Sequence, residues 1–311
     1  MPRLRSPSLL VVVNAEAGSV HPDTVDAVLA ELRTAAEVEL VRTASPEELG
    51  AALGARGDSR VVALGGDGSL HAVLNALYAA DALDEAGAVG LIPLGTGNDF
   101  ARTLGIPLEP VAAAGVVLAG VPERLDLLDE EGGPTASVVA NVAHAGIGAE
   151  AAKAAADLKE TLGAAAYPLG AALAGITAAG WGLRVEVDGV VVAEEDERLL
   201  MVGVCNGRTI GGGAPLAPHA SPADGLADVV VCRAVGPLAR LGFAAGLRDG
   251  EHLLRDDVGL VRGRQVTVSG EPFPLNADGE VTEDVTSRTW TVRPDAWSAL
   301  VPARDGTQAY G

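Results

Sequence analysis

The sequence predicts an α/β fold in two parts: a parallel sheet covered by helices, followed by a mainly antiparallel, β-rich domain. The first part of the chain repeats an apolar run followed by a helical pattern, whereas after about residue 125 the rhythm changes to short β-rich runs. Continuous apolar strands that alternate with helices indicate a parallel sheet covered on both faces.

Four repeats of strand and helix make up the first part. In parallel sheets of this kind, ligands bind beyond the carboxyl ends of the strands, so the turns that follow the strands are the places to look for a site. The predicted strands are residues 9–14, 38–42, 61–64 and 89–93, and the helices that follow them are residues 22–33, 46–56, 69–80 and 98–104.

The β-rich part is expected to form a second domain, residues 125–294, after a first domain of residues 1–124. A helical stretch around residues 150–180 is inserted in it. Its clearest predicted strands are residues 137–141, 183–187, 199–205, 227–232 and 265–269.

Composition restricts the class of protein. The chain has 311 residues, a formal net charge of -20 and a pI near 4.5. Nucleic acids and anionic membranes repel a partner of this charge, so no nucleic-acid partner and no electrostatic docking on lipid are expected. The two cysteines, Cys205 and Cys232, have no neighbour at metal-ligand spacing, which argues against a disulfide framework or a zinc site. These features indicate a cytoplasmic protein.

Residues 162–183 carry no charge and are nominally long enough to cross a bilayer. Alanine and glycine dominate this stretch, Pro168 interrupts it, and large apolar side chains are sparse, so its transfer into lipid would be poorly favourable. We therefore predict a packed helical stretch and no transmembrane segment.

The motif GGDGS, residues 65–69, follows the third predicted strand. Its glycines allow a ligand to approach the main chain closely, and the N-terminus of the next helix points free amides above the sheet. That geometry suits a phosphate. The carboxylate of Asp67 would repel a phosphate unless a divalent cation lay between them, so the motif predicts a phosphate and magnesium site. The alternative is a structural turn in which Asp67 caps the helix.

A second turn of this kind follows the fourth predicted strand, in PLGTGNDFAR, residues 93–102. Its glycines flank Thr96, whose hydroxyl suits a phosphate or a ribose. Asn98 or Asp99 can cap the next helix, Asp99 adds a second carboxylate, and Arg102 adds a positive charge. Two such turns at one sheet edge favour a binding site over two ordinary capped turns.

A third acidic motif, NADGE, spans residues 276–280. Asp278 and Glu280 are two residues apart, so on an extended segment they share one face. There either carboxylate can act as a base while the other binds metal or orients its partner. The alternative is a hairpin turn with solvated carboxylates, which the dipeptide DG also favours.

The three motifs resemble, in order and separation, those of the diacylglycerol kinase catalytic-domain family, which includes bacterial lipid kinases and sphingosine kinases. The resemblance runs from NAEAG at Asn14 to the terminal VRPDAWSALVP, and PLGTGNDFAR is its most specific part. It implies a nucleotide-binding α/β domain, a β-sandwich-like domain, an active site in the cleft between them, and a C-terminal tail, residues 295–311, that returns to the first domain. The implied activity is transfer of the γ-phosphate of ATP, with Mg²⁺, to a hydroxyl of diacylglycerol or a related lipid.

The resemblance also implies roles for individual residues. The first turn lies over the ATP phosphates with Asp67 at its centre, and the DGE triplet supplies the base, with Glu280 favoured as the proton acceptor and Asp278 beside it. The residues implied to bind the nucleotide are Asn14, Thr43, Gly65, Gly66, Asp67, Gly68, Ser69, Leu70, His71, Thr96, Asn98 and Asp99.

A structural magnesium ion is implied at SPADGLAD, residues 221–228. Asp224 would supply a carboxylate, Ser221 and Leu226 would supply backbone carbonyls, and Asp126 would be linked to the ion through water. Without the resemblance, this segment is an acidic turn before a strand.

The chain departs from the family pattern at several positions. His71 and Ala72 replace the usual Asn-Glu, NAEAG replaces Asn-Pro-x-Ser-Gly, and His219 and Ala223 stand where acidic residues are frequent. Two alternatives therefore stay open: a kinase with a soluble acceptor, similar to NAD kinases, and a nucleotide-binding regulator with little catalysis.

A lipid acceptor implies contact with a membrane surface, at the inner face for a cytoplasmic protein. The uncharged stretch, residues 162–183, is a candidate to line the lipid entry. The sequence leaves a homodimer open.

Overall fold

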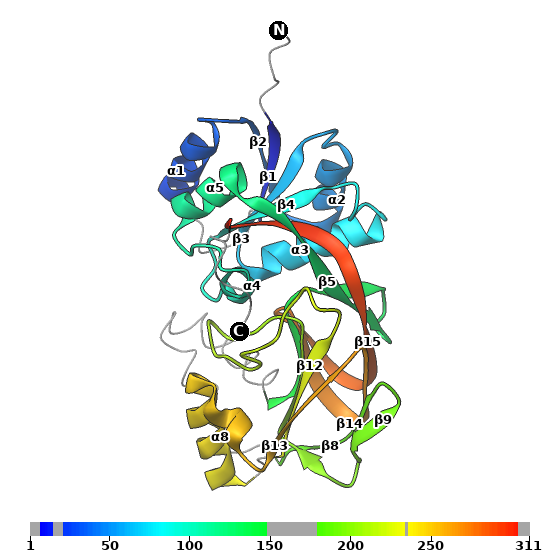
Figure 1. The fold of residues 1–311 in the computed structure, drawn as a ribbon. Helices are drawn as coiled ribbons and strands as arrows, with labels where there is room; N and C mark the ends of the chain where they lie inside the picture. The colour runs from blue at the N-terminus through cyan, green and yellow to red at the C-terminus, as the bar shows by residue number, and fades with distance from the viewer. Residues whose placement is uncertain (1–6, 15–20, 148–178, 234–235, 304–311) are drawn as a thin grey trace. The chain divides into compact units, whose positions relative to one another are not determined.

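The computed structural model of the chain describes residues 7–14, 21–147, 179–233 and 236–303 (Figure 1). The chain divides into two units, the first within residues 1–125 and 295–311 and the second within residues 126–294. The helical stretch predicted at residues 150–180 and most of the uncharged stretch lie outside the described residues, although strand β8 begins at Trp181.

In the first unit, parallel strands alternate with helices, which confirms the predicted α/β fold. The strands lie in the order β2, β1, β3, β4, and every neighbouring pair is parallel. Helix α1 contacts α5, and α2 contacts α3; Figure 1 shows α1 and α5 together on one side of the strands. The elements are β1 (Ser8–Asn14), α1 (Pro22–Leu32), β2 (Glu37–Thr43), α2 (Pro46–Gly54), β3 (Arg60–Gly65), α3 (Asp67–Ala79), β4 (Ala88–Pro93), α4 (Asp99–Thr103) and α5 (Pro110–Ala119).

The strand register aligns the carboxyl ends of these four strands. Asn14 at the end of β1 pairs with Thr43 at the end of β2, and Gly65 at the end of β3 pairs with Pro93 at the end of β4. The turns after β3 and β4 therefore lie at the same edge of the sheet, where ligands bind in parallel α/β sheets.

Helix α5 is an element that the sequence pattern does not indicate. Pro110 stands in its first turn, and the carboxylate of Glu109 caps it by accepting hydrogen bonds from the amides of Val111 (3.1 Å) and Ala112 (2.6 Å). Its residues, PVAAAGVVLA, are apolar on every side, so the alternation of polar and apolar residues that marks a surface helix is missing.

The end of the long strand β15 (Glu280–Val301) belongs to the first unit. Ser298 and Ala299 pair in parallel with Ala88 and Val89 of β4. Trp297, which is fully buried, stacks on Phe100 of α4 with ring centroids 6.1 Å apart. The strand therefore extends the first unit's sheet and packs against the helix that follows the second glycine turn.

The second unit is antiparallel and β-sandwich-like, as predicted. Its strands follow the order β13, β12, β11, β7, β14, β15, and β14 also pairs with β8, which carries β9 and β10. Strand β5 (Val121–Glu131) enters it from the first unit and pairs with β6. The other elements are β6 (Ser137–Val139), β7 (Val142–Gly146), β8 (Trp181–Val187), β9 (Val190–Ala193), β10 (Arg198–Leu199), β11 (Met201–Cys205), β12 (Ala227–Cys232), α8 (Pro237–Asp249), the 3₁₀ helix η2 (Glu251–Leu254), β13 (Val258–Gly263) and β14 (Gln265–Ala277).

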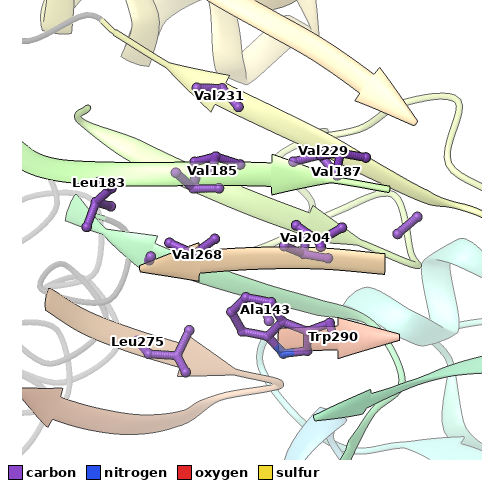
Figure 2. Packing of buried hydrophobic residues seen from close by; sticks show 14 of the residues in the cluster. Ala143, Leu183, Val185, Val187, Val204, Val229, Val231, Val268, Leu275 and Trp290 are labelled. Atoms are coloured by element: carbon purple, nitrogen blue, oxygen red, sulfur yellow. The ribbon is translucent and has the colours of Figure 1, made fainter. Parts of the chain in front are cut away.

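Two apolar cores cover the two faces of the central strands of this unit. Alternate residues of β11 enter different cores: Val202 and Val204 pack in the first, while Met201 and Cys205 pack in the second, which also contains Phe243 of α8. Figure 2 shows residues of the first core, in which valines from several strands pack in one cluster with Trp290. Because both faces are buried, these strands appear in the sequence as continuous apolar runs.

Among the residues that the structure describes, no helix combines the length and apolar character that a bilayer crossing needs.

Leu183 tests the contribution of the first core. Its side chain is fully buried in that core, so Leu183→Ala should lower the free energy of unfolding by about 2 to 5 kcal/mol through lost burial and a cavity. Val190→Ala, at a position 63% exposed on β9, is the control and should change it by less than about 0.5 kcal/mol. Chemical denaturation measures both, and equal effects would contradict the packing described here.

Candidate active site

The glycine turns after β3 and β4 pack against each other, main chain to main chain. A Cβ atom placed on Gly95 would lie 2.7 Å from the Cα atom of Gly66, and one placed on Gly66 would lie 3.0 Å from the Cα atom of Gly95. The amide of Leu94 also donates to the carbonyl of Gly65 at 3.0 Å. A side chain at either of the two touching glycines would push the turns apart, so these glycines serve the contact between the turns.

Asp67 joins the two turns through its carboxylate. Its Oδ2 accepts a hydrogen bond from the amide of Asp99 and its Oδ1 accepts one from the amide of Phe100, both at 3.0 Å. These amides lie in the first turn of α4, where a helix has backbone donors without intrahelical acceptors. Asp67 therefore does cap a helix, but it caps α4 and not its own helix α3, whose N-cap residue is Gly66.

Asn98 shapes the second turn from within. Its φ of 52° is left-handed, a conformation that asparagine adopts more readily than most residues. Its Oδ1 accepts a hydrogen bond from the amide of Gly95 at 3.0 Å, and its Nδ2 donates to the carbonyl of Gly95 at 2.7 Å. Both ends of this buried amide are thus used inside the turn.

The other residues predicted to bind a nucleotide differ in how far they are exposed to solvent. Asn14, Gly68 and Thr96 are exposed, Ser69 and His71 are partly buried, and Thr43 and Asp99 are buried. The side chain of Leu70, on the inner face of α3, is 1% exposed and packs in the core of the first unit. Leu70 can therefore contact a ligand only through its backbone.

In the second unit, Asp278 and Gly279 form a two-residue turn between β14 and β15, with Ala277 paired to Glu280. Both turn residues have positive φ, 49° and 102°, as the tight turns of β-hairpins require. The hairpin that the dipeptide DG favours is therefore present.

The carboxylate of Asp278 is buried and held by backbone amides. Its Oδ2 accepts a hydrogen bond from Ala140 at 2.6 Å, and its Oδ1 accepts hydrogen bonds from Asn141 at 2.9 Å and Val142 at 3.1 Å. The amide of Asp278 donates in return to the carbonyl of Val142 at 3.1 Å. Asp278 thereby anchors the hairpin to the segment that leads into β7.

The expectation that Asp278 and Glu280 share one face is wrong. The chain reverses between them, so Asp278 turns inward to the 140–142 amides while Glu280 stands exposed at the start of β15. The hairpin alternative supposed that both carboxylates are solvated. Asp278 is instead buried, with 8% of the residue exposed.

Asn206 is a buried polar residue near this anchor that the sequence analysis did not single out. Its Nδ2 donates to the carbonyls of Asp126 at 3.1 Å and Ala140 at 2.7 Å, and its amide donates to Asn141 at 2.9 Å. The available signal was an Asn-Gly pair directly after the apolar run of β11, where a polar side chain follows a buried strand.

His144 lies on β7 opposite Asn276 of β14. Its side chain is buried, and its Nδ1 has no hydrogen-bond partner within the described part of the chain. Burial lowers the pKa of His144 to about 4, and the nearby charge of Asp278 only partly opposes that shift. The imidazole is therefore neutral at neutral pH.

The residues expected to hold a structural magnesium ion are close together, and several already have protein partners. Asp126 accepts a hydrogen bond from the amide of Gly225 at 2.7 Å. Asp224 accepts one from the amide of Leu226 at 3.1 Å through Oδ1, and its Oδ2 pairs with Arg262. The described residues contain no group of three or more His, Cys, Asp or Glu side chains placed to hold a metal. Arg262 is a further residue that the sequence analysis did not consider.

Removing the Asp67 carboxylate should destabilise the first unit. In Asp67→Ala, the amides of Asp99 and Phe100 lose their acceptor, so we expect the free energy of unfolding to fall by about 2 to 4 kcal/mol. Asp58→Ala, at an exposed position in the same unit, is the control and should change it little. Urea denaturation followed by circular dichroism measures the difference, and two equally stable variants would show that this cap contributes nothing.

His144 should make the protein less stable in acid. Its folded pKa is about 4 and its unfolded value is 6.5, so between these pH values only the unfolded state takes up the proton. The stability due to a neutral His144 is present above pH 6.5 and is lost as the pH falls toward 4, by about 3 kcal/mol in total. His144→Gln removes this proton uptake, so the difference in unfolding free energy between wild type and variant should change with pH over that range. A constant difference would contradict the pKa shift.

Comparison with known proteins relates both units to one group of enzymes. Residues 8–129 match the diacylglycerol kinase catalytic domain, and residues 141–301 match the YegS C-terminal NAD kinase beta sandwich-like domain. Among curated relatives, a "Probable lipid kinase YegS-like" protein of Pseudomonas fluorescens is 37% identical over 254 residues, covering 80% of this chain and 79% of its own length. One of the same name from Xanthomonas campestris is 36% identical over 237 residues, covering 73% and 74%.

The fold also resembles a solved structure. A crystal structure of a diacylglycerol kinase from Bacillus anthracis superposes with a TM-score of 0.73 at 22% identity, covering 95% of this chain and 97% of that one. Because two family matches together span both units and relatives of over 30% identity cover most of its length, the chain belongs to the diacylglycerol kinase catalytic-domain family, in its YegS-like lipid kinase branch.

Proposed function

We propose that this protein transfers the γ-phosphate of ATP to a hydroxyl of diacylglycerol or a related lipid. The main support for this proposal is the pair of glycine turns that Asp67 joins at the carboxyl ends of β3 and β4. Nucleotides bind at this edge of parallel α/β sheets, and the curated relatives are named lipid kinases.

In this proposal the first unit binds the nucleotide. Gly68, at the start of α3, and Thr96, in the second turn, are exposed, and no side chain caps the N-terminus of α3. A helix N-terminus favours phosphate oxygens through its backbone amides. The remaining contacts would come from the residues that the family resemblance implies: Asn14, Thr43, Gly65, Gly66, Ser69, the backbone of Leu70, His71, and Asn98 through the shape of its turn.

A magnesium ion bound with ATP fits the first turn. Asp67 places a carboxylate in that turn, and carboxylate oxygens are ligands that Mg²⁺ prefers. Asp99 adds a second carboxylate from the second turn, where its side chain is buried. When bound, Mg²⁺ supplies the positive charge that neutralises the phosphate oxygens.

The proposed base is Glu280. Its carboxylate is exposed, whereas that of Asp278 already accepts three backbone hydrogen bonds and serves to position the hairpin. As the acceptor oxygen bonds to the γ-phosphorus, the bond from that phosphorus to the bridging β–γ oxygen breaks and ADP leaves. The hydroxyl proton passes to Glu280.

A soluble acceptor is the second candidate, because the matched C-terminal domain is described as NAD kinase-like. The regulator hypothesis rests on the altered positions 71 and 72. The ring nitrogens of His71 lie 3.3 and 3.4 Å from Nδ2 of Asn75, one turn further along α3. A peripheral place at the inner membrane face and a homodimer stay predictions.

Transfer of labelled γ-phosphate tests the proposal directly. Purified protein with Mg²⁺ and ATP is offered diacylglycerol, a sphingoid base, phosphatidylglycerol, NAD and fructose 6-phosphate. We expect a labelled lipid, and a loss of kcat by about 100-fold or more in Glu280→Gln because the proton acceptor is removed.

The matched control is Glu283→Gln, an exposed glutamate three residues further along the same strand, which should keep the wild-type rate. Labelled NAD would instead establish the soluble acceptor, and ATP binding without any product would establish the regulator. A Glu280→Gln variant as fast as Glu283→Gln would remove Glu280 from the mechanism.

A further inference from the structure

Arg262 stands in the second unit at the segment where the family resemblance implies a structural magnesium ion. It lies on β13, and the register of β12 and β13 places it directly opposite Asp228. Asp228 ends the acidic segment 221–228, and Asp224 lies four residues before it. The strand pairing therefore brings Arg262 beside Asp228 through backbone geometry, which does not depend on a bound ion.

The guanidinium of Arg262 bridges these two carboxylates. One terminal nitrogen, Nη2, donates to Oδ2 of Asp224, and Nε donates to Oδ2 of Asp228 at 3.2 Å. The side chain of Asp228 is 3% exposed, so its charge would be costly without a cation beside it.

Other groups assigned to the ion are also engaged. The second oxygen of Asp224 accepts a hydrogen bond from the amide of Leu226 at 3.1 Å. Asp126 binds the segment directly, by accepting a hydrogen bond from Gly225 at 2.7 Å and donating its own amide to the carbonyl of Pro222 at 2.6 Å. The family places a water between this aspartate and the ion, whereas here the aspartate contacts the loop itself.

The donor set does not fit magnesium. Mg²⁺ requires a near-octahedral set of oxygens at about 2.0 to 2.1 Å, and it would have to enter beside a guanidinium that already occupies the Asp224 carboxylate. The sequence points the same way, because His219 and Ala223 stand where the family frequently has acidic residues. Fewer carboxylates and one fixed cation lower the attraction for a second cation.

We propose that the guanidinium of Arg262 takes the place of the structural magnesium ion in this chain. The segment 221–228 is then folded by an internal cation, and the second unit needs no divalent metal for its stability. This inference concerns the second unit alone, so it holds whichever acceptor the enzyme uses and even if the protein transfers no phosphate.

Thermal unfolding of the nucleotide-free, full-length protein tests the proposal. Wild type and Asp224→Asn are melted in EDTA and in 10 mM MgCl₂. We expect the wild-type midpoint to gain no more from magnesium than the midpoint of Asp224→Asn, because any shared gain comes from another site. A saturable rise in the wild-type midpoint that Asp224→Asn abolishes would overturn the proposal.

Arg262→Met gives the complementary result. It leaves Asp224 and Asp228 without their cation, so its midpoint in EDTA should fall by several degrees and should recover in part with MgCl₂. Arg184→Met is the matched control, because Arg184 also bridges two carboxylates in the second unit, those of Glu186 and Glu194, away from the acidic segment.

The control midpoint should gain no more from magnesium than the wild-type midpoint. An Arg262→Met protein as stable in EDTA as wild type would overturn the proposal, since the guanidinium would then hold nothing in place. If Arg262→Met does not fold, the comparison of wild type with Asp224→Asn decides the question by itself. Neither measurement depends on kinase activity, so failure here and failure of the proposed function are distinguishable.

Discussion

The hydrogen bonds that the amides of Asp99 and Phe100 donate to the Asp67 carboxylate are the constraint on which the arrangement of the two glycine turns depends. They hold the start of α4 against the turn before α3, and only glycine at positions 66 and 95 lets the two main chains meet there. A carboxylate suits this role because its two oxygens serve two neighbouring amides at once, whereas a serine or threonine hydroxyl has one oxygen. The acidic residue in a turn of this kind is therefore accounted for by the backbone amides that it holds.

In the second unit, an aspartate of the acidic motif NADGE likewise accepts hydrogen bonds from backbone amides of another loop. Asp278 accepts three backbone hydrogen bonds from residues 140–142 and holds its hairpin with a positive φ that few residues tolerate well. In both units, an aspartate next to a glycine anchors one loop to the backbone of another. In the proposed mechanism this separates anchoring from chemistry in the DGE triplet, because the turn that buries Asp278 leaves Glu280 in solvent.

Local signals made much of this predictable. Apolar runs and helical periods marked the four strands and helices at the start of the chain, and glycine with asparagine or aspartate marked the turns. The partners of the long-range hydrogen bonds were not predictable from local signals. Asp67 lies 32 residues from its donor Asp99, and Asp278 lies 138 residues from its donor Ala140. Helix α5 was not predicted because it is apolar all round. The prediction that Asp278 and Glu280 share one face was wrong because side-chain alternation along an extended strand does not continue across a turn.

An internal cation and a bound one have different consequences for a protein that is proposed to use a metal nucleotide as well. A magnesium ion in the second unit would tie the fold of segment 221–228 to the magnesium concentration, since a ligand stabilises the state that binds it by mass action. Arg262 is part of the chain and is aligned with Asp228 by strand register, so its charge is present at every magnesium concentration. The two uses of a cation are then separated: the stability of the second unit rests on a guanidinium, and any dependence of activity on magnesium reports the nucleotide alone.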